Sequence, residues 1–192
     1  MTDLTTDDPQ KARATRRKGL LRRFSRNSKG SIAIEFAALA LPFSMLVFAI
    51  LESCISFAAQ QVLSNVTDDI AREMRTGQIR AATLDPEDLE ERICNRLQIV
   101  VSTGCPGLEI DLKEYDSFED AAKQRIEYTS TGDIDTSDFS IEIGLSGSKN
   151  QLRLFYRWPV ITDFMRRSMA NLPDGKTLHF ASVTWQNEPF DD

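Results

Sequence analysis

The sequence contains few of the residues from which catalytic and metal sites are usually built. Its 192 residues include one histidine, His179, and three cysteines that are too far apart for a Cys-x-x-Cys motif. This composition argues against a zinc site, and no Ser/His/Asp set, phosphate-binding glycine loop or other cluster of metal ligands is visible. We therefore expect no enzymatic activity and no cofactor, and we interpret His179, within an alternating segment, as structural.

Acidic residues are missing from residues 11–30, which hold nine lysines and arginines. Residues 1–30 carry a net charge of +6 and the rest of the chain carries −12, which together give the total of −6. The acidic part is unsuited to binding nucleic acid. A basic stretch directly before an apolar run is the positive-inside signal, which predicts a cytoplasmic N-terminus and an exported C-terminal part.

Charge is also nearly missing from residues 32–51, where Glu35 is the one ionisable residue. Twenty residues at about 1.5 Å each span roughly 30 Å, the thickness of the hydrocarbon core of a bilayer. A buried core helix is the alternative, but such helices are usually shorter and keep a polar face. The run predicts a transmembrane helix over 31–57, kinked at Pro42 and ending near Glu52 at the far interface.

The helix is expected to continue beyond the membrane. Val62, Val66, Ile70 and Met74 recur every four residues, and Gly77 is a natural helix stop. We therefore expect four parts: a basic cytoplasmic leader (1–30), the transmembrane helix (31–57), its periplasmic extension (58–80) and a periplasmic head domain (81–192).

The head is predicted to have an α+β fold with an antiparallel sheet. Period-two alternation predicts strands over 108–112, 139–143, 152–158 and 177–185, with one face of the sheet exposed to water. Short helices are expected from Pro86, after an Asp85 cap, and over 117–125 and 162–171. The acidic stretch 130–138 lacks the spacing of a calcium loop, so a solvated loop is expected.

The cysteines of the head allow two interpretations. If this part is exported, a Cys94–Cys105 disulfide is favoured, with a stabilisation of about 3 kcal/mol in the chain-entropy model. If it is cytosolic, both are reduced structural thiols. Cys54 has no cysteine near it and is interpreted as a small lipid- or helix-facing residue.

The start of the apolar run resembles a known processing motif. Gly30-Ser31-Ile32-Ala33-Ile34-Glu35-Phe36-Ala37, followed by Pro42, is similar to the N-terminal motif of type IV pilins and pseudopilins, and in particular to the TadE-like minor pilins of the tight-adherence (Tad) pilus. The segments 157–159 (Arg-Trp-Pro) and 185–190 (Trp-Gln-Asn-Glu-Pro-Phe) are similar to segments of the same family, although a basic residue often stands where this chain has Gln186.

The resemblance implies a minor pilin that takes part in assembly of a Tad (Flp-type) pilus. A prepilin peptidase would cut between Gly30 and Ser31, and Glu35, Phe36, Pro42 and Glu52 would take part in subunit assembly. Glu35 either reaches the lipid head groups or pairs with the new N-terminal ammonium of its own or a neighbouring chain. The implied partners are a second minor pilin, the major Flp pilin and the inner-membrane assembly platform.

The implied location is the bacterial inner membrane, crossed once, with the head in the periplasm. The sequence leaves open whether the protein enters the fibre, caps its tip or primes assembly. The main alternative is an uncleaved, signal-anchored envelope protein that binds a ligand or senses the periplasm. A thiol–disulfide enzyme is a distant third, which the cysteine spacing disfavours.

Overall fold

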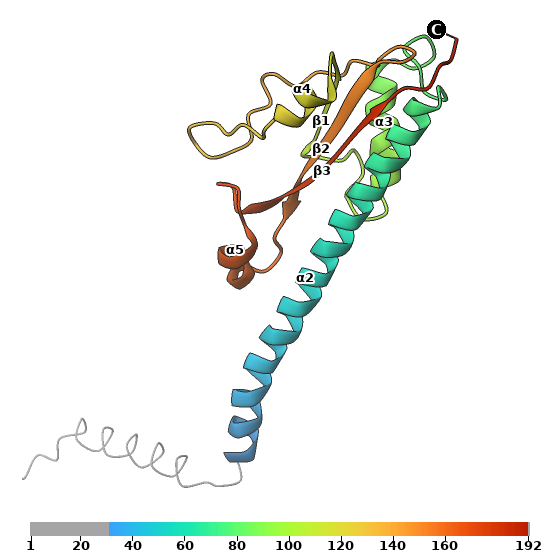
Figure 1. The fold of residues 1–192 in the computed structure, drawn as a ribbon. Helices are drawn as coiled ribbons and strands as arrows, with labels where there is room; N and C mark the ends of the chain where they lie inside the picture. The colour runs from blue at the N-terminus through green and yellow to red at the C-terminus, as the bar shows by residue number, and fades with distance from the viewer. Residues whose placement is uncertain (1–30, 192) are drawn as a thin grey trace, which may run out of the picture. The chain divides into compact units, whose positions relative to one another are not determined.

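The computed structural model describes residues 31–191, and Gly30 and the basic leader lie outside this range. The predicted α+β class is confirmed (Figure 1), because a long helix is followed by a small domain with an antiparallel sheet and short helices. The elements in chain order are α2 (Ser31–Arg75), α3 (Pro86–Leu97), β1 (Leu108–Tyr115), α4 (Phe118–Lys123), β2 (Lys149–Pro159), α5 (Asp163–Met169) and β3 (Lys176–Gln186).

Helix α2 extends over two compact units, which divide the chain between Phe48 and Ala49. It is one continuous α-helix of 45 residues, and Pro42 lies inside it without ending it. It is long and apolar enough to cross a membrane, and none of its most apolar stretch is buried within the protein. The helix ends near Gly77, which has the positive φ of 72° expected of a glycine that stops a helix.

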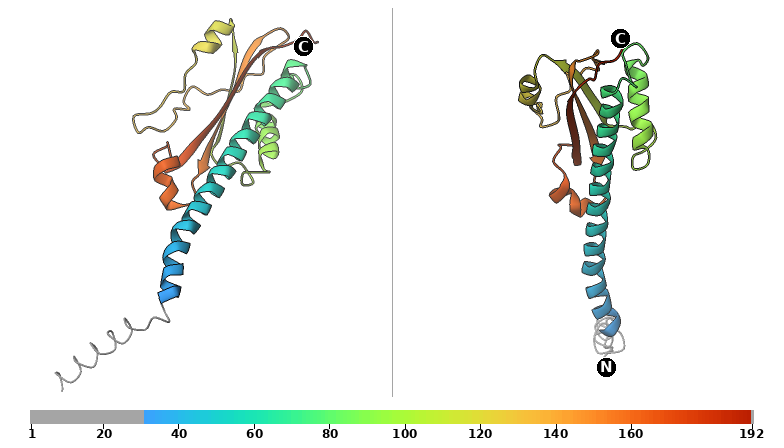
Figure 2. Two further views of the ribbon diagram at one scale, coloured as in Figure 1. Left: turned by 60° about the horizontal axis from the view of Figure 1, so that its bottom comes forward. Right: turned by 45° about the vertical axis from the view of Figure 1, so that its right-hand side comes forward.

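The second unit, Ala49–Asp192, has its core between α2, α3 and one face of the sheet (Figure 2). Three of the four residues of the predicted stripe on α2 are buried, since Val66, Ile70 and Met74 are at most 6% exposed, and Val62 is partly buried against the core. Leu89 and Ile93 of α3 are fully buried in the same core. The inward-facing residues of β2 complete it: Leu152, Leu154, Tyr156 and Trp158.

The sheet has three strands in the order β1-β2-β3, and both pairs are antiparallel. The strand predicted over 139–143 is wrong. In this segment only an isolated bridge forms, in which the Leu112 amide donates to Ser140 and its carbonyl accepts from Glu142. The chain then turns away through Ser148, so no ladder continues along the edge of β1.

The prediction of a water-exposed sheet face is also wrong for the central strand β2. Figure 1 shows α4 and the loop after it on the side of the sheet opposite to α2. Phe139 of this loop stacks on Phe155 at 5.0 Å, and the Gln151 side chain donates to the carbonyl of Ala121 in α4. Polar residues of β2 on this face are therefore buried: Gln151 is 8% and Arg153 6% exposed.

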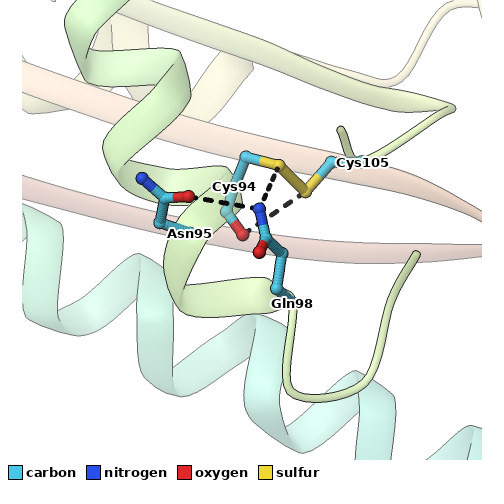
Figure 3. Close-up of a disulfide and its surroundings, with 4 residues drawn as sticks. All are labelled: Cys94, Asn95, Gln98 and Cys105. Carbon is cyan, nitrogen blue, oxygen red and sulfur yellow. Dashed lines mark hydrogen bonds between the residues drawn. A yellow bond between two sulfur atoms is a disulfide. The ribbon is translucent and has the colours of Figure 1, made fainter. Parts of the chain in front are cut away.

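A disulfide joins α3 to the loop before β1, as predicted (Figure 3). Cys94 and Cys105 have their Cα atoms 5.7 Å apart, within the usual range for a disulfide. The Gln98 side chain lies over the bridge, with its amide nitrogen 3.8 Å from the Cys94 sulfur and 3.1 Å from Asn95 Oδ1. Asp85 is at the N-cap position of α3 as predicted, but its side chain accepts no capping hydrogen bond.

Candidate functional site

The N-terminal half of α2 presents large apolar side chains to its surroundings. Side chains from Ile32 to Leu51 are mostly exposed, and Phe36 is 72% exposed. A soluble surface rarely carries so many exposed apolar groups together, so this half of the helix is a contact surface for lipid or for other apolar helices. The helix is consistent with a single-pass membrane anchor.

The first polar residue after this run, Glu52, is bound inside its own chain. Its side chain is only 5% exposed, and one carboxylate oxygen accepts from the amide of Ile161 at 2.5 Å and of Thr162 at 3.2 Å. The other oxygen accepts from the Thr162 hydroxyl. The carboxylate thereby satisfies backbone donors at the start of α5, where Thr162 is the N-cap. A contact of Glu52 with another subunit stays a prediction.

Two further polar side chains, those of Ser56 and Gln60, follow Glu52 on α2 at intervals of four residues. Ser56 Oγ lies 3.0 Å from His179 Nε2. The Gln60 side chain binds both backbone groups of Phe180: its nitrogen donates to the carbonyl at 2.8 Å, and its oxygen accepts from the amide at 3.2 Å. Residues four apart share one helix face, so Glu52, Ser56 and Gln60 form a polar row that attaches α2 to β3 and to the β2–α5 loop.

The role of this polar row in attaching α2 to the head was not predicted from the sequence, although its residues recur at a regular interval of four. Glu52, Ser56 and Gln60 lead directly into the buried apolar face of α2, whose first residues are Ala59 and Leu63. A polar continuation of an apolar helix face indicates a second contact surface on the same side. The partners of the row could not be read from the sequence, since they lie about 110 to 123 positions away.

His179 is a structural residue, as predicted. It is 5% exposed and its ring stacks on Trp158 with the ring centres 5.4 Å apart. Burial lowers the pKa of His179 from 6.5 to about 4. The imidazole is therefore neutral in the folded protein and bonds to a hydroxyl.

We expect the head to lose stability as the pH falls from 6.5 to 4. In this window the unfolded chain binds a proton at His179 that the folded chain does not, so lower pH favours unfolding. The shift of 2.5 pKa units corresponds to at most about 3 kcal/mol. Urea unfolding of the detergent-solubilised protein at several pH values checks this, and His179→Gln is the control that should flatten the profile. An equally steep profile in His179→Gln would show that other groups cause the loss.

The segment 185–190 packs against the C-terminal end of α2. The Trp185 indole donates to Asn187 Oδ1 at 2.7 Å, and the side-chain nitrogen Nδ2 of Asn187 donates to the carbonyl of Leu145 at 2.8 Å. The amide of Glu188 then donates to the carbonyl of Arg75, the last residue of α2, at 2.9 Å. This C-terminal segment therefore satisfies a helix-end carbonyl and fixes α2 to the head.

No metal centre is formed within residues 31–191, because no three His, Cys, Asp or Glu side chains come together there. Asp133, in the acidic loop, lies 3.4 Å from the guanidinium of Arg157. The structure brings Cys94 and Cys105 together, whereas Glu35, Phe36 and Pro42 lie along the exposed half of α2. Gly30 lies outside the described residues.

Comparison with known proteins gives one match. Residues 30–72 match the model of a family described as TadE-like protein, and this range contains Gly30, Glu35 and the polar row that begins at Glu52. No curated protein and no solved structure matches the chain. The TadE-like family suggests a role in Tad pilus assembly and is not an enzyme family. The resemblance to TadE-like proteins that the sequence predicted is thus confirmed for the stretch from Gly30 through most of α2.

Proposed function

We propose that this protein is a minor pilin that a bacterial cell needs to assemble a Tad pilus. The observation that carries the proposal is the division of α2 at Glu52. Before this residue the helix is apolar and exposed, and after it one face is buried in the protein's own head. A pilin needs both properties in one helix, since its lower half must pack in lipid and then against other subunits while its upper half stays attached to its own head.

The proposed sequence of events begins in the inner membrane, with residues 1–30 in the cytoplasm. A prepilin peptidase cuts between Gly30 and Ser31, and Ser31 acquires a free ammonium group. The cut removes a net charge of +6, which would otherwise hold the helix end at the cytoplasmic face. The shortened helix then moves from lipid into contact with other spans.

Glu35 is proposed to select the partner in this step. A carboxylate within hydrocarbon is costly by at least about 2.5 kcal/mol on insertion scales, so it gains from a cation once neighbouring helices exclude water. The ammonium at Ser31 of an adjacent subunit has the opposite charge and lies about one helical turn from the level of Glu35. The proposed partners are a second minor pilin, the major Flp pilin and the inner-membrane assembly platform.

Replacing Gly30 by leucine is expected to leave the full-length precursor in the membrane. A peptidase must fit an extended backbone closely on the N-terminal side of the cut, and a leucine side chain obstructs that approach. An immunoblot of membranes from the native host, followed by N-terminal sequencing, measures the outcome. Gly19→Leu, the same change within the leader, is the matched control and should be processed normally. A product that begins at Ser31 in Gly30→Leu would refute cleavage at this site.

A further inference from the structure

Two large apolar side chains at the corner between β2 and α5 face away from the core. Ile161 is 70% and Phe164 44% exposed, although Val160 beside them is buried at 5%. We call residues 160–169 the β2–α5 corner. Single exposed apolar residues are common on protein surfaces. Whether this pair marks a contact surface therefore depends on where it lies in the fold.

The corner is held against α2 at the point where the apolar run ends. Glu52 binds the amides of Ile161 and Thr162, and the residue before it, Leu51, is 51% exposed. Ile55, one turn later on α2, is 50% exposed. Exposed apolar side chains therefore lie on both α2 and the corner, close in the chain to the contact that Glu52 makes, within one compact unit. Figure 1 shows α5 at the end of the sheet opposite to the C-terminus of the chain.

Helix α5 adds positive charge beside this apolar pair. Arg166 pairs with Asp163 at 3.0 Å and keeps 48% of its side chain exposed, while Arg167 is exposed. On α2, the Glu52 carboxylate already accepts hydrogen bonds from the corner itself. Large apolar side chains next to arginine are typical of segments that lie in a membrane interface, where guanidinium groups bind lipid phosphates.

We propose that the β2–α5 corner rests in the lipid head-group layer. Ile161 and Phe164 reach the acyl boundary, and Arg167, with Arg166 beside it, binds the phosphates of anionic lipids. The inference rests on the proposed function in one respect, since it requires α2 to span the bilayer. The head then has a second attachment to the membrane, which fixes its depth and restrains its rotation about α2. Transfer of the helix into a filament must break this contact.

Fluorescence quenching in vesicles tests the proposal on the full chain. The variant Cys54→Ser/Ser168→Cys carries a fluorophore on α5, four residues after Phe164. The vesicles contain phosphatidylcholine with or without phosphatidylglycerol and a lipid with a nitroxide on its head group. We expect strong quenching, increased by phosphatidylglycerol. Adding Ile161→Ser and Phe164→Ser should reduce quenching at least two-fold, and Arg167→Gln should remove the dependence on phosphatidylglycerol.

Two controls separate this inference from the proposed function. Leu145→Ser replaces another exposed side chain of the head, 56% exposed, and should leave the quenching unchanged. A fluorophore at Phe43→Cys, in the Cys54→Ser background, reports insertion of α2 through a nitroxide on the lipid acyl chain. Quenching at position 43 without quenching at 168 overturns the inference and leaves the proposed function intact. No quenching at 43 overturns both.

Discussion

Replacing Glu35 by alanine is expected to abolish surface pili without changing membrane insertion or cleavage. In the proposed topology, Glu35 of the single protein lies within about one turn of the membrane edge, where head groups and water relieve the cost of its charge. In the proposed filament, packed helices exclude water, and the ammonium of a neighbouring subunit supplies an opposite charge. Glu35→Ala removes this proposed pairing, which would fix the axial position of one helix against the next.

The measurement combines pilus counts by electron microscopy with co-purification of partner pilins. Glu35→Asp should be intermediate, because the charge remains while the side chain is shorter. Ser44→Ala, which removes a different exposed polar group of the same apolar stretch, is the matched control and should assemble normally. If Glu35→Ala forms as many pili as the parent, Glu35 is only an interfacial carboxylate and the ammonium pairing is wrong.

Replacing Asp111 by alanine is expected to destabilise the head by about 3–5 kcal/mol, because it leaves a buried charge without its partner. Asp111 is 1% and Arg153 6% exposed, and Asp111 Oδ2 accepts from Arg153 Nη2 at 2.5 Å and Nε at 2.8 Å. The guanidinium lies within 6 Å of the rings of Phe139 and Phe155, so little water can replace the carboxylate. Such a loss is a large fraction of the free energy of unfolding of a protein domain, which is about 5–15 kcal/mol.

A neighbouring ion pair supplies the control for this experiment. Glu109, two residues earlier on β1, lies 2.7 Å from Arg157 but is 35% exposed at its side chain. Its removal should cost about 1 kcal/mol or less, since Glu109 is partly solvated and Arg157 keeps its contact with Asp133. Urea unfolding of both variants measures the difference. Equal losses for Asp111→Ala and Glu109→Ala would show that burial of the Asp111–Arg153 pair has no special effect.

The spacing of apolar residues along the sequence was enough to predict helices and strands in which that spacing is regular. Val66, Ile70 and Met74 at helical spacing predicted the buried half of α2, and the alternation over 152–158 predicted β2. The same period of two led to the wrong prediction of a strand over 139–143. This segment is an extended loop that contacts β1 at one bridge, and its sequence alternates as that of a strand does.

Features that depend on distant partners could not be predicted. The alternation over 152–158 predicted a water-exposed sheet face, but Arg153 on that face is buried and pairs with Asp111, which lies 42 residues away. Glu52 was predicted at a membrane interface, but no local pattern indicates that the amides of the β2–α5 corner bind its carboxylate. Gly30 and Glu35 could be proposed because a short motif contains both. The short helix predicted over 162–171 did not indicate that Ile161 and Phe164 are exposed, because their exposure depends on how α5 packs on the rest of the head.

N-terminal sequencing of the protein extracted from membranes of pilus-forming cells shows directly whether the chain is cut after Gly30. If it is, we expect a single mature sequence that begins Ser-Ile-Ala-Ile-Glu, from Ser31 onward. A chain in those cells that still begins at Met1 or Thr2 contradicts processing after Gly30, and the protein would then be an uncleaved membrane anchor.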